Sequence, residues 1–318
     1  MRILLVVNGS ASSVTARRQV IVQMVLSRHH DVDVAETNRR GHATKLALDA
    51  ALRGVDVVAV LGGDGTLNEV ANGIVGTECA LAPLPGGSTN VFARALGLPD
   101  DPVDAAVATL DALDAGSIRP VGLGALQGRY FLFHVGFGWD AALVERVEKR
   151  AELKRYAGHP LFIYAGITTF FGGYDRSRPR FRLRIDEVAP GAAGAGDTVD
   201  DARFAVVLNL NPYTFVGNRP FNIAPDATLD RPLTVVAIRD MRTVPFLRLL
   251  GSALGDGQRL RNSPDVVAYR PDVTALTISP YDPLPYQVDG DHLGDIGEVQ
   301  LTHHPEAMRL VVPLPSTG

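Results

Sequence analysis

Hydrophobic positions in the N-terminal third of the chain follow two alternating patterns. Short apolar or half-apolar runs, typical of strands, alternate with segments in which apolar residues recur every three or four positions, as on one face of a helix. Regular alternation of strand and helix predicts a doubly wound α/β domain with a parallel sheet. The expected strands are Ile3–Val7, Asp31–Glu36, Val55–Leu61 and Cys79–Leu84, and the expected helices lie near Val20–Val25, at Ala43–Leu52, from Thr66 onward and at Asn90–Leu96.

The pattern changes near Gly116–Val121. Beyond it, short strand candidates are separated by Gly, Pro and Asp, and one long helical region, Trp139–Phe171, interrupts them; this predicts an antiparallel, β-rich second domain. The strand candidates are Tyr130–Val135, Arg180–Ile185, Phe204–Asn209, Leu233–Ile238, Val273–Ser279 and Arg309–Val312. The expected domains are residues 1–120, with the C-terminal segment 303–318 as a candidate to rejoin them, and residues 121–302. Pro190–Asp201 is expected to form a flexible surface loop.

Composition narrows the class of protein. The 318 residues are 46% hydrophobic and 21% charged, which is typical of a globular protein of about two domains. The net charge of −4 argues against a nucleic-acid-binding protein. The single cysteine, Cys79, excludes a disulfide framework and is expected to be buried, and the eight histidines show no metal-binding spacing, so no metal-ligating residue is assigned. No apolar stretch is long enough for a membrane span or a signal peptide, so we expect a soluble, cytoplasmic protein.

The first candidate for chemistry is the glycine-rich segment LGGDGTLNEVANGI, residues 61–74. It follows an expected strand, and Thr66 with Glu69 fits a capping box that starts a helix at Thr66. Gly62, Gly63 and Gly65 allow a tight turn, and free amides at a helix N-terminus attract phosphate. The alternative is a plain strand–turn–helix connection, in which the glycines allow the tight turn and bind no ligand.

A second segment repeats this arrangement on the next strand. Pro85–Asn90 (PGGSTN) places Gly87, Ser88 and Thr89 before another helix, although Ser88 could be only an N-cap. Neither segment is a Walker A sequence. Gly136–Ala141 fits G-x-G-x-x-A, but no parallel strand closes such a unit, which favours a packing turn over a dinucleotide site.

Two carboxylates near the C-terminus flank a glycine in the segment Tyr286–Gly294 (YQVDGDHLG). Asp289 and Asp291 could lie at a solvated hairpin tip, or one could accept a hydroxyl proton in a phosphoryl-transfer enzyme. An EF-hand is a poor match, because Gln300 stands where its closing Glu belongs. Asp64 is the competing candidate, either as a base or as a ligand of nucleotide-bound Mg²⁺.

Residues 146–184 contain ten Lys and Arg against three acids, a local net charge of +7. Leu161–Tyr164 and Phe170–Phe171 lie between the basic clusters. Cations beside exposed aromatic residues favour binding to an anionic membrane surface. The alternative is that the aromatic residues are core and the arginines line a solvated strand face. No recognition motif supports nucleic acid.

The motifs GGDGTLNEVANGI, PGGSTNVFARALGLP and VDGD, in this order, resemble those of the diacylglycerol kinase catalytic-domain family. This group of bacterial lipid kinases also includes sphingosine and ceramide kinases. TNRRGHA, GFGWDA and IAPDATLD match as well, so the resemblance covers nearly the whole chain. GGDGT alone is shared with NAD kinases, whereas LNEVANG and the segment Asn90–Arg94 favour lipid kinases.

The resemblance implies an α/β nucleotide-binding domain, a β-sandwich domain that holds the lipid, and a site in the cleft between them. It also implies ATP with nucleotide-borne Mg²⁺, and Asp291 as the proton acceptor beside Asp289. From the loop chemistry, we expect Asp64 to organise metal and phosphate. With the loop reasoning, the expected nucleotide contacts are Thr37, Gly62, Gly63, Asp64, Gly65, Thr66, Asn68, Gly87, Ser88, Thr89 and Asn90.

This chain departs from the family pattern in three places. Val91 stands where an Asp is frequent, and Asn8–Ser12 lacks the usual Asn-Pro-x-Ser-Gly. Arg231, in Asp230-Arg231-Pro232, stands where many bacterial members have the second Asp of Asp-Asp-Gly, a ligand of a structural Mg²⁺. Because a cation cannot ligate Mg²⁺, we expect that structural site to be missing.

The sequence therefore predicts an ATP-dependent lipid kinase, with diacylglycerol as the first candidate substrate, at the inner face of the cell membrane. One alternative is an NAD-kinase-like enzyme or another kinase of a soluble alcohol. The other is a catalytically inactive lipid- or nucleotide-binding protein, which the Val91 and Arg231 departures keep open. Whether the chain forms a homodimer is also left open.

Overall fold

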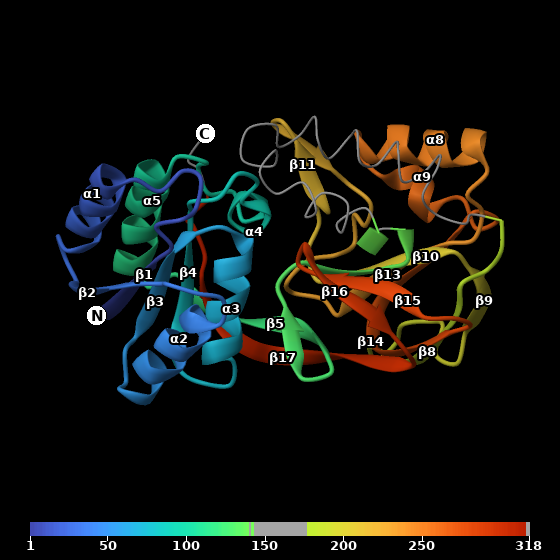
Figure 1. Ribbon diagram of the computed structural model, residues 1–318, viewed down its shortest axis with the longest axis horizontal. Helices are drawn as coiled ribbons and strands as arrows, with labels where there is room; N and C mark the ends of the chain where they lie inside the picture. Colours follow the sequence, from blue (N-terminus) through green and yellow to red (C-terminus); the bar gives the residue numbers. More distant parts are fainter. Residues whose placement is uncertain (140, 143–176, 316–318) are drawn as a thin grey trace. The chain divides into compact units, whose positions relative to one another are not determined.

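The computed structural model describes residues 1–139, 141–142 and 177–315 (Figure 1). The chain forms two compact units, Met1–Val121 with the segment that starts at Pro305, and Gly122–His304. It leaves the first unit within strand β5 (Ile118–Leu126) and returns within strand β17 (Val299–Val311). Among the described residues, no helix is long and apolar enough to cross a membrane.

The first unit contains a parallel sheet with strand order β17-β4-β3-β1-β2. Its strands β3 and β4 are buried at every position, as expected when helices cover both faces. Figure 1 shows α1 and α5 on one face and α2 and α3 on the other. The predicted α/β class is confirmed. The elements are β1 (Arg2–Val7), α1 (Ala16–Leu26), β2 (Asp31–Glu36), α2 (His42–Leu52), β3 (Val57–Gly62), α3 (Asp64–Ile74), β4 (Ala80–Pro85), α4 (Val91–Ala95) and α5 (Pro102–Asp114).

Helices α2 and α3 pack closely and share a cap. A Cβ on Gly73 would lie 2.6 Å from the Thr44 carbonyl oxygen, so the close approach of the two helices needs glycine there. The Glu69 carboxylate of α3 accepts hydrogen bonds from the amides of Gly41 (2.8 Å) and Ala43 (3.2 Å) at the start of α2. The N-cap residue of α2 is Gly41, which has no side chain, so Glu69 takes the capping role from a neighbouring helix.

The predicted capping box at Thr66 is therefore wrong. Helix α3 begins at Asp64, after the N-cap residue Gly63. The Thr66 hydroxyl instead accepts a hydrogen bond of 2.8 Å from the Asn8 side chain, and Glu69 caps a different helix. Both side chains that the pattern assigned to a local cap therefore bond to distant segments: Thr66 to Asn8, and Glu69 to the start of α2.

Helix α5 was not expected, although its start carries ordinary signals. Asp101 accepts hydrogen bonds from the amides of Val103 and Asp104, and Pro102 occupies the first helical turn. Cys79 is buried as predicted, and burial raises the pKa of its thiol to about 11.

The second unit is antiparallel and β-rich. One layer has the strand order β16-β15-β7-β10-β13-β14, and the second half of β14 turns into another layer, where it pairs with β8 and β17. The bounds are β6 (Arg129–Phe131), β7 (His134–Phe137), β8 (Phe181–Val188), β9 (Thr198–Ala202), β10 (Phe204–Leu208), β11 (Thr214–Val216), β12 (Arg219–Phe221), β13 (Leu233–Ile238), α8 (Thr243–Ala253), α9 (Gln258–Arg261), β14 (Val267–Pro280), β15 (Leu284–Val288) and β16 (Asp291–Ile296).

Strand β10 shows where the two cores of this unit lie. Its Ala205 and Val207 belong to the core between the two layers, which also contains Phe181 and Leu276. The residues that alternate with them, such as Val206, point to the other face, where helix α8 packs. The unit is an antiparallel β-sandwich, as the resemblance implied, and helix α8 covers one of its faces.

Some expected elements differ. Tyr130–Val135 is not one strand but the end of β6 and the start of β7, because the chain turns between them. The end of the expected loop Pro190–Asp201 is strand β9, which pairs with β8. Of the expected helical region Trp139–Phe171, residues 139 and 141–142 are described and helical, and residues 140 and 143–171 lie outside the described residues.

Removing the cap that α3 provides should weaken the first unit. We expect Glu69→Ala to lower the free energy of unfolding by about 1–2 kcal/mol, because two amides at the start of α2 lose their acceptor. Urea denaturation measures the effect. Glu78→Ala is the control, because Glu78 pairs with Arg309 at the surface, and should cost less than about 0.5 kcal/mol. Equal losses in both variants would contradict the capping role.

Candidate functional site

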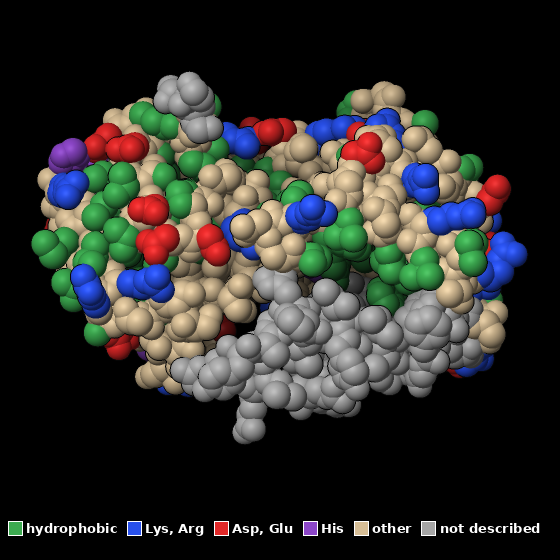
Figure 2. All heavy atoms as spheres, turned by 90° about the horizontal axis from the view of Figure 1, so that it is seen from above, with side chains coloured by type: hydrophobic (Ala, Val, Ile, Leu, Met, Phe, Trp, Pro, Cys, Tyr) green, Lys and Arg blue, Asp and Glu red, His purple; other side chains and the backbone are tan. Residues whose placement is uncertain are grey.

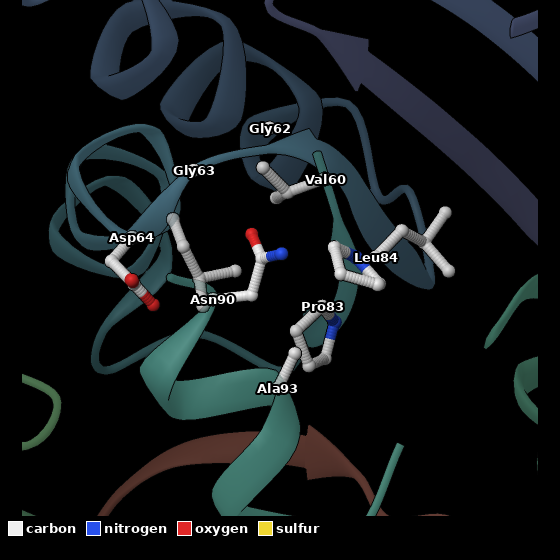
Figure 3. A pocket seen from close by; sticks show the side chains of 10 residues that line it. Val60, Gly62, Gly63, Asp64, Pro83, Leu84, Asn90 and Ala93 are labelled. Atoms are coloured by element: carbon white, nitrogen blue, oxygen red, sulfur yellow. The ribbon is translucent and has the colours of Figure 1, made fainter. Parts of the chain in front are cut away.

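The two glycine-rich segments lie against each other at the carboxyl ends of neighbouring strands (Figure 3). The Gly86 amide donates a hydrogen bond of 2.9 Å to the Gly62 carbonyl oxygen. A Cβ on Gly86 would lie 2.8 Å from the Gly62 nitrogen, and one on Gly87 would lie 2.8 Å from the Gly63 Cα. Side chains at Gly86 and Gly87 would push the loops apart, so their contact requires these glycines.

The Asp64 carboxylate fastens helix α4 to the first loop. Its two oxygens accept hydrogen bonds from the amides of Val91 (3.0 Å) and Phe92 (3.1 Å). A carboxylate at the start of a helix also meets the positive end of the helix dipole. Asp64 therefore serves as the N-terminal cap of a helix other than its own.

Asn90 fixes the second loop from within. Its side-chain oxygen accepts a hydrogen bond of 2.8 Å from the Gly87 amide, and its side-chain nitrogen donates to the Gly87 carbonyl and to Asp100. Its backbone is left-handed, with φ of 49°, a conformation that Asn tolerates better than most residues. Asp64 and Asn90 also line a small pocket together with Val60 and Pro83 (Figure 3).

The open side of the loops carries a different set of groups. Gly65 and Ser88 are exposed, and Thr66 and Thr89 are partly exposed. The first hydrogen bond within α3 runs from the Leu67 amide to the Gly63 carbonyl, so the amides of Gly65 and Thr66 precede it. Donors at the start of an eleven-residue helix, beside hydroxyl groups, fit the phosphate oxygens of a nucleotide.

Two expected nucleotide contacts have other surroundings. The Asn68 side chain is 2% exposed, and Asn72 donates a hydrogen bond to it within α3. Thr37 follows β2 and is half-buried, and its amide donates to the Val7 carbonyl oxygen of β1. The structure thus brings the two loops together, keeps Asn68 inside, and sets Thr37 at the end of a different strand.

In the second unit, Asp289 is a buried acceptor of backbone hydrogen bonds. It is 5% exposed and accepts from the amides of Leu132 (2.7 Å), Phe133 (3.0 Å) and His134 (3.0 Å). With Gly290 it forms the two-residue turn between β15 and β16, and both residues have positive φ. Asp289 therefore holds the break between β6 and β7, and it does not lie at a solvated tip.

His134 supports this turn from the interior. Its ring packs on Tyr213, with ring centroids 4.4 Å apart. Burial lowers the pKa of His134 to about 3, so the imidazole is neutral at physiological pH.

Asp291, two residues after Asp289, forms an ion pair with a side chain. It is the first residue of β16, and its carboxylate lies 3.1 Å from the guanidinium of Arg129, with both side chains about 30% exposed. Arg129 follows the tight turn Gln127–Gly128 that leads into β6. Sequence reasoning missed Arg129, because no local signal relates residues 162 positions apart.

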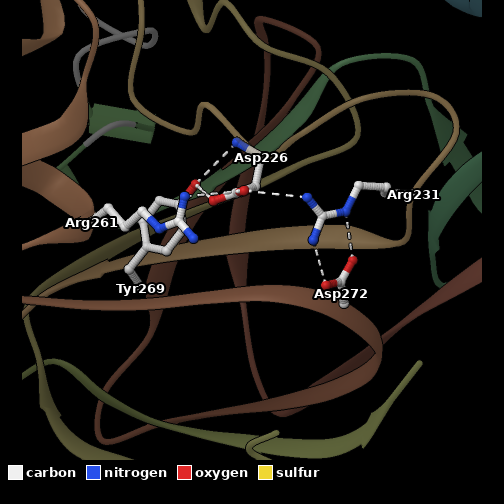
Figure 4. Close-up of polar contacts among 5 residues, drawn as sticks. All are labelled: Asp226, Arg231, Arg261, Tyr269 and Asp272. Carbon is white, nitrogen blue, oxygen red and sulfur yellow. Dashed lines mark hydrogen bonds and ion pairs between the residues drawn. The ribbon is translucent and has the colours of Figure 1, made fainter. Parts of the chain in front are cut away.

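A third group of charges surrounds Arg231 (Figure 4). Its guanidinium makes two hydrogen bonds to Asp272, of 2.8 and 2.5 Å, and one of 3.2 Å to Asp226. The Tyr269 hydroxyl donates to the other Asp226 oxygen, and Arg261 lies 3.5 Å from Asp226. These residues do not fit the structural Mg²⁺ of related kinases, because a guanidinium already stands between the two carboxylates.

The described end of the basic stretch is paired with acids. Arg178 lies 3.1 Å from Asp282, and Arg184 lies 2.6 Å from Asp186. Arg182 forms an ion pair with Asp200. The aromatic segments Leu161–Tyr164 and Phe170–Phe171 lie outside the described residues, so these arginines alone give little support to membrane binding by this stretch.

Comparison with known proteins adds to this geometry. The family described as "Diacylglycerol kinase catalytic domain" matches residues 2–126. The "Diacylglycerol kinase" of Bacillus subtilis strain 168 is 37% identical over 120 residues, which are 37% of this chain and 39% of the relative. A "Probable lipid kinase YegS-like" of Pseudomonas aeruginosa UCBPP-PA14 is 31% identical over 234 residues, 68% of this chain and 74% of the relative.

A solved structure described as a diacylglycerol kinase of Bacillus anthracis strain Sterne shares the fold, with a TM-score of 0.75 and 22% identity over 100% of this chain and 98% of that one. Fold and matches together define a kinase, an enzyme that transfers a phosphoryl group. The chain belongs to the diacylglycerol kinase catalytic-domain family of lipid kinases, as its motifs suggested.

Asp289 and Asp291 should respond differently to the same substitution. We expect Asp289→Asn to lower the free energy of unfolding by about 2–4 kcal/mol, because three buried amides lose a charged acceptor while Asn still tolerates the positive φ. Asp291→Asn should cost less than about 1 kcal/mol, because it removes one partly exposed ion pair. Denaturant unfolding with two probes compares them. A larger loss in Asp291→Asn would contradict this division of roles.

Arg231 should stabilise the second unit without a metal ion. We expect Arg231→Met to lower the free energy of unfolding by about 1–2 kcal/mol, because Asp226 and Asp272 lose their shared cation. The loss is kept this small because the Arg231 side chain is 40% exposed and solvent weakens its ion pairs. Arg259→Met is the control. Thermal unfolding of the unaltered protein should be the same in millimolar Mg²⁺ and in EDTA. A clear loss of melting temperature in EDTA would show that a bound metal stabilises the chain.

Proposed function

We propose that this protein uses ATP to phosphorylate the hydroxyl of diacylglycerol or a similar membrane lipid. The observation that carries the proposal is the pair of contacting glycine loops, which leave the amides of Gly65 and Thr66 open at the start of α3. The names of the relatives, a diacylglycerol kinase and YegS-like lipid kinases, support a lipid acceptor.

The proposal assigns the nucleotide to the first unit. The amides of Gly65 and Thr66 would receive phosphate oxygens, with Ser88 and Thr89 as hydroxyl donors and Thr37 as a further contact. Mg²⁺, when bound with the nucleotide, would neutralise charge on the transferring phosphoryl group. Asp64 would shape the site by holding α4, since both its oxygens accept backbone hydrogen bonds.

The proposal assigns the proton acceptor to Asp291 in the second unit. Asp289 is buried among three amides, which leaves Asp291 as the accessible carboxylate of the pair. Asp291 would take the proton of the lipid hydroxyl. The hydroxyl oxygen would bond to the terminal phosphorus of ATP, and the bond between that phosphorus and the ADP oxygen would break. The products are ADP and a lipid phosphate. Because the acceptor is a membrane lipid, the enzyme would act at the inner face of the cell membrane.

Asp291→Asn tests the assigned base. We expect turnover to fall by at least about 10²-fold, because the amide cannot accept the proton, while nucleotide affinity stays unchanged. Single-turnover kinetics and nucleotide titration measure the two quantities. Asp295→Asn, an exposed Asp on the same strand, is the matched control and should keep full activity. Full activity of Asp291→Asn would remove Asp291 from the mechanism.

Incubation of the purified protein with radiolabelled ATP and a panel of acceptors tests the substrate class. We expect label in diacylglycerol, with sphingosine, ceramide and NAD as competing acceptors. Label in NAD but in no lipid would replace the proposal with an NAD-kinase-like activity. Nucleotide binding without label in any acceptor would favour a non-catalytic binding protein.

A further inference from the structure

Helix α8 is apolar on two opposite faces. Its inward residues Phe246 and Leu249 are buried in the core that β10 and β13 form with this helix. On the outward side, Val244 is 58% exposed, Leu247 is 52% exposed, and Leu254, which caps the helix, is 46% exposed. A surface helix normally presents polar side chains outward, so the outer face of α8 departs from that pattern.

The spacing aligns these exposed residues. Positions 244, 247, 251 and 254 fall on one side of a helix with 3.6 residues per turn, and position 251 is glycine, which adds no polar group. Single exposed apolar residues are ordinary, but an aligned set indicates a contact surface. We call Val244, Leu247 and Leu254 the outer stripe.

Arginines border the outer stripe. Arg248 is exposed one turn after Val244, and Arg259 is exposed on α9, which packs against α8. Neither forms an ion pair with any of the described residues. The segment Met241–Arg261 contains four arginines and one acid, Asp256. Figure 2, a view from above, shows hydrophobic and basic side chains together on the part of the molecule that carries α8.

This combination fits an anionic lipid surface better than other occupants. Leucine and valine side chains enter the boundary between headgroups and acyl chains, and arginines at the same level pair with lipid phosphates. A symmetric contact between two copies would bring Arg248 towards its own counterpart, which like charges disfavour. Exposed apolar residues on α2, Leu48 and Leu52, differ because the acid Asp49 lies between them.

We propose that the outer stripe of α8, with Arg248 and Arg259, docks this protein on an anionic bilayer. The role of this docking rests on the proposed function, because a lipid kinase must reach a substrate that lies in a membrane. Docking itself requires neither nucleotide nor turnover, so it can be measured separately from catalysis.

The test is co-sedimentation of the full chain with vesicles of phosphatidylcholine and phosphatidylglycerol, without nucleotide. We expect Leu247→Glu to weaken partitioning about tenfold, because a half-exposed leucine that would be buried in lipid becomes charged. Arg248→Gln with Arg259→Gln should reduce the preference for phosphatidylglycerol and flatten the salt dependence. Leu52→Glu, at a more exposed position on α2, is the matched control and should bind as the unaltered protein does.

Thermal unfolding should be the same for all these variants, since the substituted positions face solvent. Vesicle binding of Leu247→Glu equal to that of the unaltered protein, or no binding by the unaltered protein, would overturn the docking proposal. A dimer that Leu247→Glu dissociates in analytical ultracentrifugation would overturn it too, because a second copy would cover the stripe. Activity on a short-chain diacylglycerol dissolved in water should survive Leu247→Glu. Docking without phosphorylation of any lipid would support the surface and overturn the proposed function.

Discussion

Carboxylates that accept backbone N–H groups hold the candidate site in place. Asp64 accepts two amides at the start of α4, Glu69 accepts two at the start of α2, and Asp289 accepts three between β6 and β7. An ionised acceptor makes stronger hydrogen bonds than a neutral one, and at a helix start it also meets the positive end of the dipole. These acceptors fix the start of α4 beside the first glycine loop, the start of α2 beside α3, and the break between β6 and β7.

This arrangement changes how the acidic residues of the motifs are interpreted. An acid within a glycine-rich loop, or beside a turn, is a natural candidate for a base or a metal ligand. Here the carboxylates of Asp64 and Asp289 accept hydrogen bonds from backbone amides, whereas the carboxylate of Asp291 contacts the Arg129 side chain. The distinction separates residues that build the site from the residue that we propose to act in it.

The sequence predicted those features that depend on local pattern. The alternation of apolar runs with helical patterns located the parallel strands. Because β3 and β4 are neighbours, the two loops that follow them lie at one edge of the sheet. The motifs predicted the kinase family. The pattern failed where a side chain serves a distant segment, as with Glu69, whose partners lie 26 to 28 residues away, and Arg129, whose partner lies 162 away. It also did not indicate that Arg231 would sit between Asp226 and Asp272.

The tight contact between Gly86 and Gly62 has a consequence for recognition. With no space for a side chain at that contact, a phosphate group at the open side of the loops would meet the main-chain amides of Gly65 and Thr66, which respond to negative charge and not to the identity of a base. For the nucleotide that we propose, discrimination between adenine and guanine would therefore come from residues outside the paired glycines. Residues outside this contact can therefore change without separating the loops, whereas a side chain at Gly86 or Gly87 would lie only 2.8 Å from the opposite loop.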